Sequence, residues 1–253
     1  DPHIVFSDID QNKLRIAHYK AGSWTSEVIS SLEHSESEWG KEFTFTISPA
    51  GLLSVVFTDD NGMYFATRES NEQWAIETVN LEVRSGSYPV LAYNAEELPI
   101  LAYADRINHY LEFARRDNRG WQVSQVISTP INDLSIAIDT IGQAHIVYTE
   151  EDTHLLRYAV QNGAGWSISL VDGVEALAQS PSLILTATGA PRISYYSLAN
   201  RRLQFAWVDN SSSLTENTGG EHPLVISTHY RSGQTFITWD EQIQMEGEIY
   251  RIY

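Results

Sequence analysis

The sequence contains no cysteine and very little lysine. The absence of cysteine excludes disulfide bonds, thiolate metal sites and a cysteine nucleophile. All three lysines lie before residue 42, and 33 acidic residues against 16 basic ones give a formal net charge of −17. Because the chain has no basic stripe for a phosphate backbone, we expect no binding to nucleic acid, and no binding to an anionic membrane surface. A neutral or cationic partner suits this charge.

The sequence also lacks long apolar runs. None approaches the roughly 18 residues that a membrane-spanning helix needs. The hydrophobic content of 42% and the aromatic content of 11% are nevertheless ample for a folded core. The sequence starts at Asp1 and Pro2 rather than at methionine, which fits removal of an upstream signal segment and predicts a secreted or periplasmic protein.

What the sequence does contain is an internal repeat of about 44–51 residues. Each copy has an aromatic residue at the end of a short apolar run, and these aromatics are Phe6, Phe57, Tyr103, Tyr148, Tyr195 and Trp239. A glycine precedes the aromatic by six residues in most copies, at Gly51, Gly142, Gly189 and Gly233, and Glu97 takes its place in the third copy. A tryptophan closes four copies, at Trp24, Trp74, Trp121 and Trp166.

Each copy reads as four short strands separated by turn residues, and no window shows a helical period. Units of four strands at this period predict an all-β fold, a β-propeller of six blades with four antiparallel strands each. We expect residues 1–253 to form a single propeller domain. The glycine should adopt a positive φ in the turn between the first two strands, and the tryptophans should cover the core between neighbouring blades.

The repeat begins inside a unit, so the first and last blades are expected to be incomplete. The first blade lacks its innermost strand, which would leave backbone groups unpaired. A second copy of the chain or a neighbouring domain would therefore be a natural partner to complete it.

The turns before two tryptophans resemble a known motif. RDNRGW (Arg116 to Trp121) and QNGAGW (Gln161 to Trp166) are similar to the Asp box of neuraminidase-type repeats. They depart from it in that no serine lies two residues before the acid, and in the fourth copy Asn162 replaces the acid. The resemblance implies a propeller, the fold of sialidases, polysaccharide lyases and several lectins. Sialidases hold a substrate carboxylate with three arginines and use a tyrosine nucleophile. The inner-strand candidates here, Arg84, Arg192, Arg231 and Tyr230, come from different turns and define no convergent triad.

The turns between the second and third strands carry the candidate site. An acid closes the second strand at Asp8, Asp59, Asp105, Glu150 and Glu241, and Ser197 takes this place in the fifth copy. A polar residue follows four positions later at Asn12, His109, His154 and Arg201. One interpretation is that these side chains close the hairpins through local hydrogen bonds. Alternatively they line a face that binds a polar ligand such as a sugar. A third interpretation is calcium, because Asp8, Asp10 and Asn12 alternate as oxygen ligands do in a calcium loop.

The favoured function is therefore non-catalytic recognition of a carbohydrate or a protein on this loop face. The alternatives are a glycan-active enzyme, sialidase-like or a polysaccharide lyase, and a structural interaction module. No cofactor is expected apart from calcium.

Overall fold

A computed structural model describes residues 2–32, 43–69, 73–81, 88–163, 165–172 and 177–207, and the backbone of residues 225–231 and 234–240. The chain divides into two compact units, Asp1–Thr215 and Glu216–Tyr253. Each unit is all-β. That the two together form one propeller domain stays a prediction.

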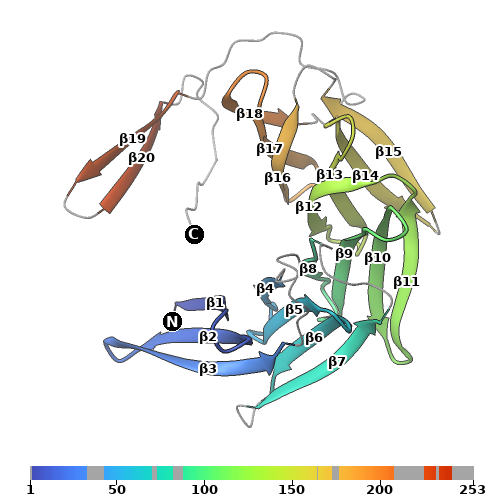
Figure 1. Ribbon diagram of the computed structural model, residues 1–253. Coiled ribbons are helices and arrows are strands. Elements are labelled where there is room, and N and C mark those ends of the chain that lie inside the picture. Colours follow the sequence, from blue (N-terminus) through green and yellow to red (C-terminus); the bar gives the residue numbers. More distant parts are fainter. Residues whose placement is uncertain are drawn as a thin grey trace. The chain divides into compact units, whose positions relative to one another are not determined.

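The described part of the first unit forms five antiparallel sheets in chain order (Figure 1). The strands of its first two sheets are β1 (His3–Asp8), β2 (Lys13–Lys20), β3 (Ser23–Ser31), β4 (Phe43–Ile47), β5 (Leu53–Asp59), β6 (Gly62–Arg68) and β7 (Trp74–Asn80). The strands of the other three are β8 (Val90–Tyr93), β9 (Pro99–Asp105), β10 (Tyr110–Asp117), β11 (Gly120–Ile127), β12 (Ile131–Ile138), β13 (Ala144–Glu150), β14 (Leu156–Asn162), β15 (Gly165–Asp172), β16 (Ala178–Leu185), β17 (Pro191–Ser197) and β18 (Arg202–Trp207).

In the second unit the described residues are those of β19 (Val225–Arg231) and β20 (Gln234–Asp240), which pair as antiparallel strands. The described residues thus form six antiparallel sheets, as the repeat predicts. No helix in the described part of the chain is long and apolar enough to cross a bilayer.

The first sheet is incomplete, as expected. It has three strands in the order β1-β2-β3, and β1 pairs with β2 alone among the described strands. The sheets of β4–β7, β8–β11 and β12–β15 have four strands each, and the sheet of β16–β18 has three. These antiparallel sheets of three or four strands, one for each of the first five copies of the repeat, confirm the predicted all-β architecture.

Neighbouring sheets of the first unit pack face to face, and the period of two along each strand explains why. On β9, Leu101 and Tyr103 pack against the preceding sheet, whereas Ile100, Ala102 and Ala104 pack against the following one. Strand β9 is buried along its whole length because both of its faces are covered. We call the contact between the sheets of β1–β3 and β4–β7 the first junction. The second junction joins the sheets of β4–β7 and β8–β11, and the third joins those of β8–β11 and β12–β15.

The turns between first and second strands of the sheets confirm the predicted backbone. Gly51, Gly142 and Gly189 have φ values of 87°, 83° and 80°, in the left-handed region that glycine adopts readily. Glu97 stands at the same place in the turn between β8 and β9 and has a φ of 60°.

The tryptophans at the start of the outer strands pack as predicted in three of four sheets. Trp74, Trp121 and Trp166 each contact the core of the junction with the preceding sheet. The prediction is wrong for Trp24, which is 49% exposed and packs on Tyr19 of its own sheet. The physical reason is its place in the first sheet, since each of the other three tryptophans packs on the sheet that precedes its own.

Candidate functional site

The acids of the predicted loop face accept hydrogen bonds from their own turns. Asp8 Oδ1 accepts from the Gln11 backbone N at 3.2 Å, and Asp59 Oδ1 accepts from the Asn61 backbone N at 2.8 Å. Such bonds satisfy backbone groups in the hairpin, which is the local role considered in the sequence analysis.

The third acid of this series is the most fully engaged. Asp105 is buried, and its Oδ1 accepts from the backbone N of Ile107 and Asn108 at 2.9 and 3.0 Å. Its Oδ2 accepts from Asn108 Nδ2 at 2.7 Å. In the next sheet Glu150 accepts from Thr153 Oγ1 and from Arg157 Nε. These carboxylates hold the turns.

The polar residues four positions later share one backbone conformation. Asn12, His109, His154 and Arg201 have φ values of 52°, 59°, 54° and 50°. The constant spacing between acid and polar residue therefore has a structural cause, because each residue occupies the left-handed position of an equivalent turn. A ligand-binding role for them, and for the acids, stays a prediction.

Some predicted sites lie beyond what the structure describes. Glu241 and Arg84 fall outside the described residues, and the side chains of Tyr230 and Arg231 do as well. For calcium at Asp8, Asp10 and Asn12, the described residues contain no group of three or more His, Asp or Glu side chains arranged for a metal ion. The calcium site stays a prediction.

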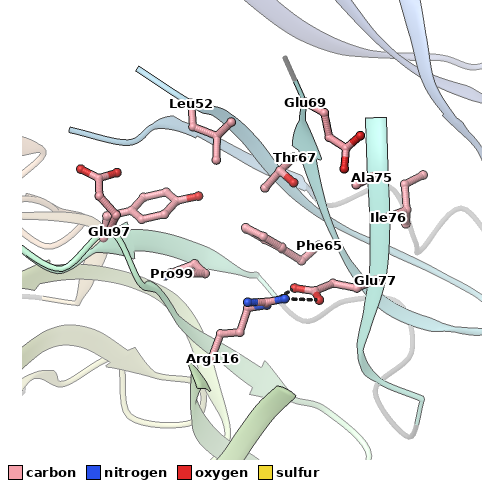
Figure 2. A pocket seen from close by; sticks show the side chains of 11 residues that line it. Leu52, Phe65, Thr67, Glu69, Ala75, Ile76, Glu77, Glu97, Pro99 and Arg116 are labelled. Carbon is pink, nitrogen blue, oxygen red and sulfur yellow. Dashed lines mark hydrogen bonds and ion pairs between the residues drawn. The ribbon is translucent and has the colours of Figure 1, made fainter. Parts of the chain in front are cut away.

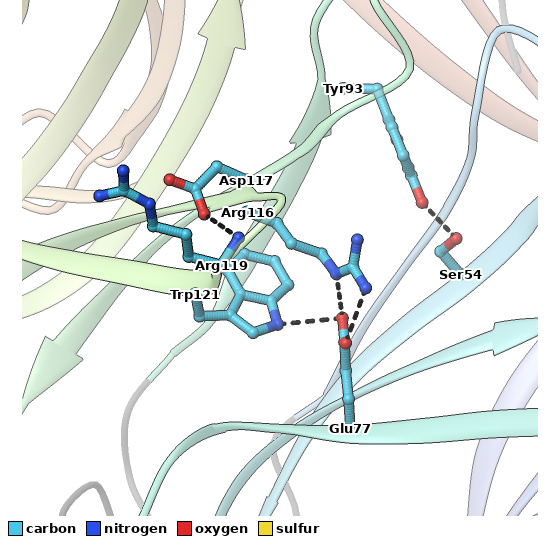
Figure 3. Close-up of polar contacts among 7 residues, drawn as sticks. All are labelled: Ser54, Glu77, Tyr93, Arg116, Asp117, Arg119 and Trp121. Atoms are coloured by element: carbon cyan, nitrogen blue, oxygen red, sulfur yellow. Dashed lines mark hydrogen bonds and ion pairs between the residues drawn. The ribbon is translucent and has the colours of Figure 1, made fainter.

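The second junction brings together charged side chains that lie far apart in the sequence (Figure 3). Glu77 Oε1 accepts from Arg116 Nε at 2.6 Å, and Glu77 Oε2 accepts from Arg116 Nη2 at 3.0 Å. Trp121 Nε1 also donates to Glu77 Oε1, at 3.1 Å. The Arg116 Nη1 group makes no hydrogen bond within the described part of the chain. One guanidinium donor is thus left for another partner.

Next to this ion pair lies a pocket of about 320 Å³. We call it the junction pocket; Figure 2 shows the lining side chains, which are Leu52, Phe65, Thr67, Glu69, Ala75, Ile76, Glu77, Tyr93, Glu97, Pro99 and Arg116. The pocket combines apolar and aromatic walls with a few polar groups, as small-molecule sites do. Its residues come from β6 and the start of β7, from the ends of β8 and β10, and from the turns before β5 and β9. This is the opposite end of the sheets from the predicted loop face.

One side chain distinguishes this junction from its neighbours. Thr67 lies two residues after Phe65, which is paired with Glu77 across β6 and β7. The equivalent residue at the first junction is His18, whose Nε2 lies 3.5 Å from Glu27 Oε1 and whose ring packs edge-on against His3.

At the third junction the equivalent residue is Arg115. Its guanidinium lies 5.7 Å from the centroid of the Phe113 ring and donates to Gln161 Oε1 at 3.1 Å. A histidine or an arginine thus occupies the space that the short side chain of Thr67 leaves open at the second junction.

The electrostatics of the pocket favour neutral tyrosine beside fixed charges. Burial raises the pKa of Tyr93, and the nearby Glu97 carboxylate raises it further, whereas the hydrogen bond with Ser54 Oγ, 2.5 Å away, opposes the rise. The hydrogen bonds to Glu77 raise the pKa of Arg116, so its positive charge is permanent. The pocket can therefore offer a guanidinium donor, carboxylate acceptors and an aromatic wall.

A role for Glu77, Arg116 and Thr67 in a site was not predicted from the sequence. A signal for the first two exists in the repeat, because a glutamate follows the tryptophan by three residues in the first two copies, at Glu27 and Glu77. An arginine precedes the next tryptophan by five or six residues, at Arg68 and Arg116. The first junction uses this set too: Glu27 accepts from Arg68 at 3.1 Å and from Trp74 Nε1 at 3.0 Å.

No protein-family model matches the chain, and no curated protein sequence matches it. Solved structures do. AofleA from Arthrobotrys oligospora aligns with a TM-score of 0.57 and 13% identity over 82% of this chain. The chain spans 65% of the length of AofleA.

Two further structures align similarly. The fucose-specific lectin from Aleuria aurantia has a TM-score of 0.54 and 16% identity, over 81% of this chain and 70% of the lectin. A protein of unknown function from Dyadobacter fermentans has a TM-score of 0.53 and 12% identity, over 78% of this chain and 68% of that one. At these identities the likeness concerns the fold, and together with the face-to-face sheets of the first unit it establishes an all-β propeller fold.

Proposed function

We propose that this protein is a non-catalytic recognition propeller that binds a carbohydrate, and that the junction pocket is its binding site. The observation that carries the proposal is the open pocket beside the Glu77–Arg116 pair, with a guanidinium donor to spare. The fold likeness to a fucose-specific lectin supports a sugar as the ligand. This places the site at the end of the sheets opposite the one that the sequence suggested.

The chemistry of the pocket suits a saccharide. Sugars present hydroxyl groups that both donate and accept hydrogen bonds, and apolar C–H faces that pack on aromatic rings. Arg116 Nη1 can donate to a hydroxyl, carboxylate oxygens can accept from one, and the rings of Phe65 and Tyr93 offer apolar surface. A volume of about 320 Å³ is at the lower end of the range for ligand pockets, about 300–1,000 Å³, and suits one sugar unit.

The decisive experiment fills the pocket as the third junction does. The full chain is titrated calorimetrically with a panel of monosaccharides that begins with L-fucose, and the titration is repeated with Thr67→Arg. We expect at least one sugar to bind the parent chain and its affinity for Thr67→Arg to be at least roughly tenfold lower, about 1.4 kcal/mol. The control is Thr25→Arg, the same change at an exposed position of β3.

Two outcomes would contradict the proposal. The first is that no sugar binds the parent chain. The second is that Thr67→Arg binds as tightly as Thr25→Arg. Melting curves of both variants show whether the fold survives the substitution.

The finer assignments remain proposals of the same kind. The kinship with neuraminidase-type repeats is supported by the turn before Trp121, in which the Arg119 backbone N donates to Asp117 Oδ1 at 2.7 Å and Gly120 has a φ of 105° (Figure 3). A protein ligand, and a second copy or neighbouring domain that completes the first blade, are supported by the single partner of β1 among the described strands. Secretion and calcium binding rest on the sequence.

A further inference from the structure

One wall of the junction pocket is built by an unusual residue. The turn from Asn94 to Glu97 has the same hydrogen bonds as its counterparts: the Glu97 backbone N donates to Asn94 O at 3.1 Å, just as the Gly142 backbone N donates to Asp139 O at 3.1 Å. Only the residue differs, because Glu97 adopts a φ of 60° where the equivalent turns use glycine. A residue with a Cβ pays conformational energy in this region, and such strain is concentrated at functional sites.

The strained turn brings a carboxylate to the pocket. Glu97 is half-buried and lines the pocket, and Figure 2 shows it on one side while the Arg116–Glu77 pair lies on another. Glu97 and Tyr93 line the same pocket, and the Glu97 carboxylate contributes to the raised pKa of Tyr93. Within the described chain the Glu97 side chain makes no hydrogen bond or ion pair.

The balance of charge in the pocket is negative. Three carboxylates, Glu69, Glu77 and Glu97, line it with a single guanidinium, that of Arg116. Glu77 already shares both its oxygens with Arg116, so the charge of Arg116 is matched without Glu97. A half-buried carboxylate with apolar neighbours is stabilised by a cation that approaches it.

We propose that Glu97 determines the specificity of the junction pocket and selects a saccharide with an ammonium group, an amino sugar with a free amine, over its neutral parent. This inference rests on the proposed carbohydrate-binding function. The ammonium group has three donors for the Glu97 carboxylate, and such charge-assisted bonds are about twice as strong as neutral ones. The hydroxyl groups of the same sugar can accept from Arg116. The net charge of −17 adds long-range attraction for a cationic ligand.

The test compares amino sugars with their neutral parents. The full chain is titrated with D-glucosamine, D-galactosamine and D-mannosamine, with the three parent hexoses, and with the N-acetylated forms, at a pH where the free amine is protonated and at low salt. At least one free amine should bind roughly tenfold or more tightly than its parent and its N-acetylated form.

Variants then assign the preference to Glu97. Glu97→Gln removes the charge and should make the affinity for the amino sugar nearly equal to the affinity for its neutral parent. Glu97→Gly restores the residue of the equivalent turns; it should lose the same preference and raise the melting temperature, because the strain is relieved. Glu96→Gln is the matched control, since this exposed neighbour in the same turn does not line the pocket. It should keep the preference of the parent chain.

The outcomes separate the two proposals. If neutral hexoses bind as well as the amino sugars, or if Glu97→Gln keeps the preference, the inference about Glu97 is overturned while carbohydrate binding stands. If none of the sugars binds, both fail. Loss of the preference for amino sugars in Glu96→Gln as well would also overturn the inference about Glu97, because the general field of the acidic surface would then be the cause.

Discussion

Glu77 on β7 and Arg116 on β10 form a two-bond ion pair across the second junction, and the same two side chains line its pocket. The pair therefore has two physical roles. It ties two sheets together, and it fixes the guanidinium so that its remaining donor has a defined position. Fixing a group before the ligand arrives reduces the entropy lost on binding.

Arg116→Gln should separate these roles. We expect sugar affinity to fall at least roughly tenfold because the guanidinium donor is lost. The Arg116 and Glu77 side chains are 42% and 34% exposed, so loss of the pair should lower the free energy of unfolding by only about 1 kcal/mol. Calorimetric titration and denaturant unfolding measure the two effects. Arg119→Gln, three residues further on and exposed, is the control and should behave as the parent chain. Unchanged affinity in Arg116→Gln would remove the pocket as the site.

The tryptophans give a prediction about stability alone. Trp121 packs edge-on against Phe65, with ring centroids 5.3 Å apart, and contacts the core of the second junction. Trp121→Ala should lower the free energy of unfolding by about 3–5 kcal/mol, the usual cost of removing a packed aromatic side chain. Trp24→Ala should cost less than about 1 kcal/mol, because Trp24 is 49% exposed. If both variants lose the same free energy of unfolding, then packing of Trp121 on the preceding sheet does not stabilise the protein.

The fold could be predicted because its signals are local. Alternation with period two sends Leu101 and Tyr103 to one junction and Ile100 and Ala102 to the other, and this alternation is visible in the seven residues of β9. The glycines of the turns are equally local, since a positive φ is required within a single turn. A repeat multiplies such signals and makes them hard to miss.

The pocket could not be predicted in the same way because it depends on pairs of distant residues. Glu77 and Arg116 are 39 residues apart in the chain. The pocket is open because Thr67 is short, whereas His18 and Arg115 fill the equivalent spaces at the other two junctions. The equivalence of these three positions becomes visible only when the sheets are packed. The sequence pointed instead to the acids before the hairpin turns, because their spacing is regular. In the structure this spacing reflects the left-handed backbone position that each equivalent turn contains.

Asp105 tests whether those acids hold turns. Asp105→Ala removes the acceptor for two backbone N–H groups and for the Asn108 side chain. The free energy of unfolding should fall by about 2–3 kcal/mol, since three part-buried hydrogen bonds of about 1 kcal/mol each would be lost. Sugar affinity should stay that of the parent chain, because the junction pocket lies at the other end of the sheets. The control Asp10→Ala, exposed in the turn after β1, should change neither quantity. Lost sugar binding with intact stability in Asp105→Ala would return the site to the loop face.

A buried histidine makes the stability depend on pH. His145 on β13 lies against the Tyr158 hydroxyl through Nδ1, and its Nε2 is 3.4 Å from Asp139 Oδ2. Burial lowers the pKa of His145 below its ordinary value of 6.5, and Asp139 opposes the shift only in part. Below pH 6.5 the unfolded chain therefore binds a proton that the folded chain does not, so the contribution of His145 is complete above that pH and is lost as the pH falls.

His145→Gln removes this titration. When the pH is lowered from about 7.5 to about 5.5, the free energy of unfolding of the parent chain should fall more steeply than that of His145→Gln. The difference in slope cannot exceed about 1.4 kcal/mol per pH unit, the limit for one proton. Denaturant unfolding at a series of pH values measures it, and carboxylates contribute equally to both chains. His109→Asn, a change at an exposed turn histidine, should keep the steep slope. If His145→Gln and the parent chain run parallel, then the ring is protonated in the folded state as readily as in the unfolded one, and the Asp139 carboxylate rather than burial governs it.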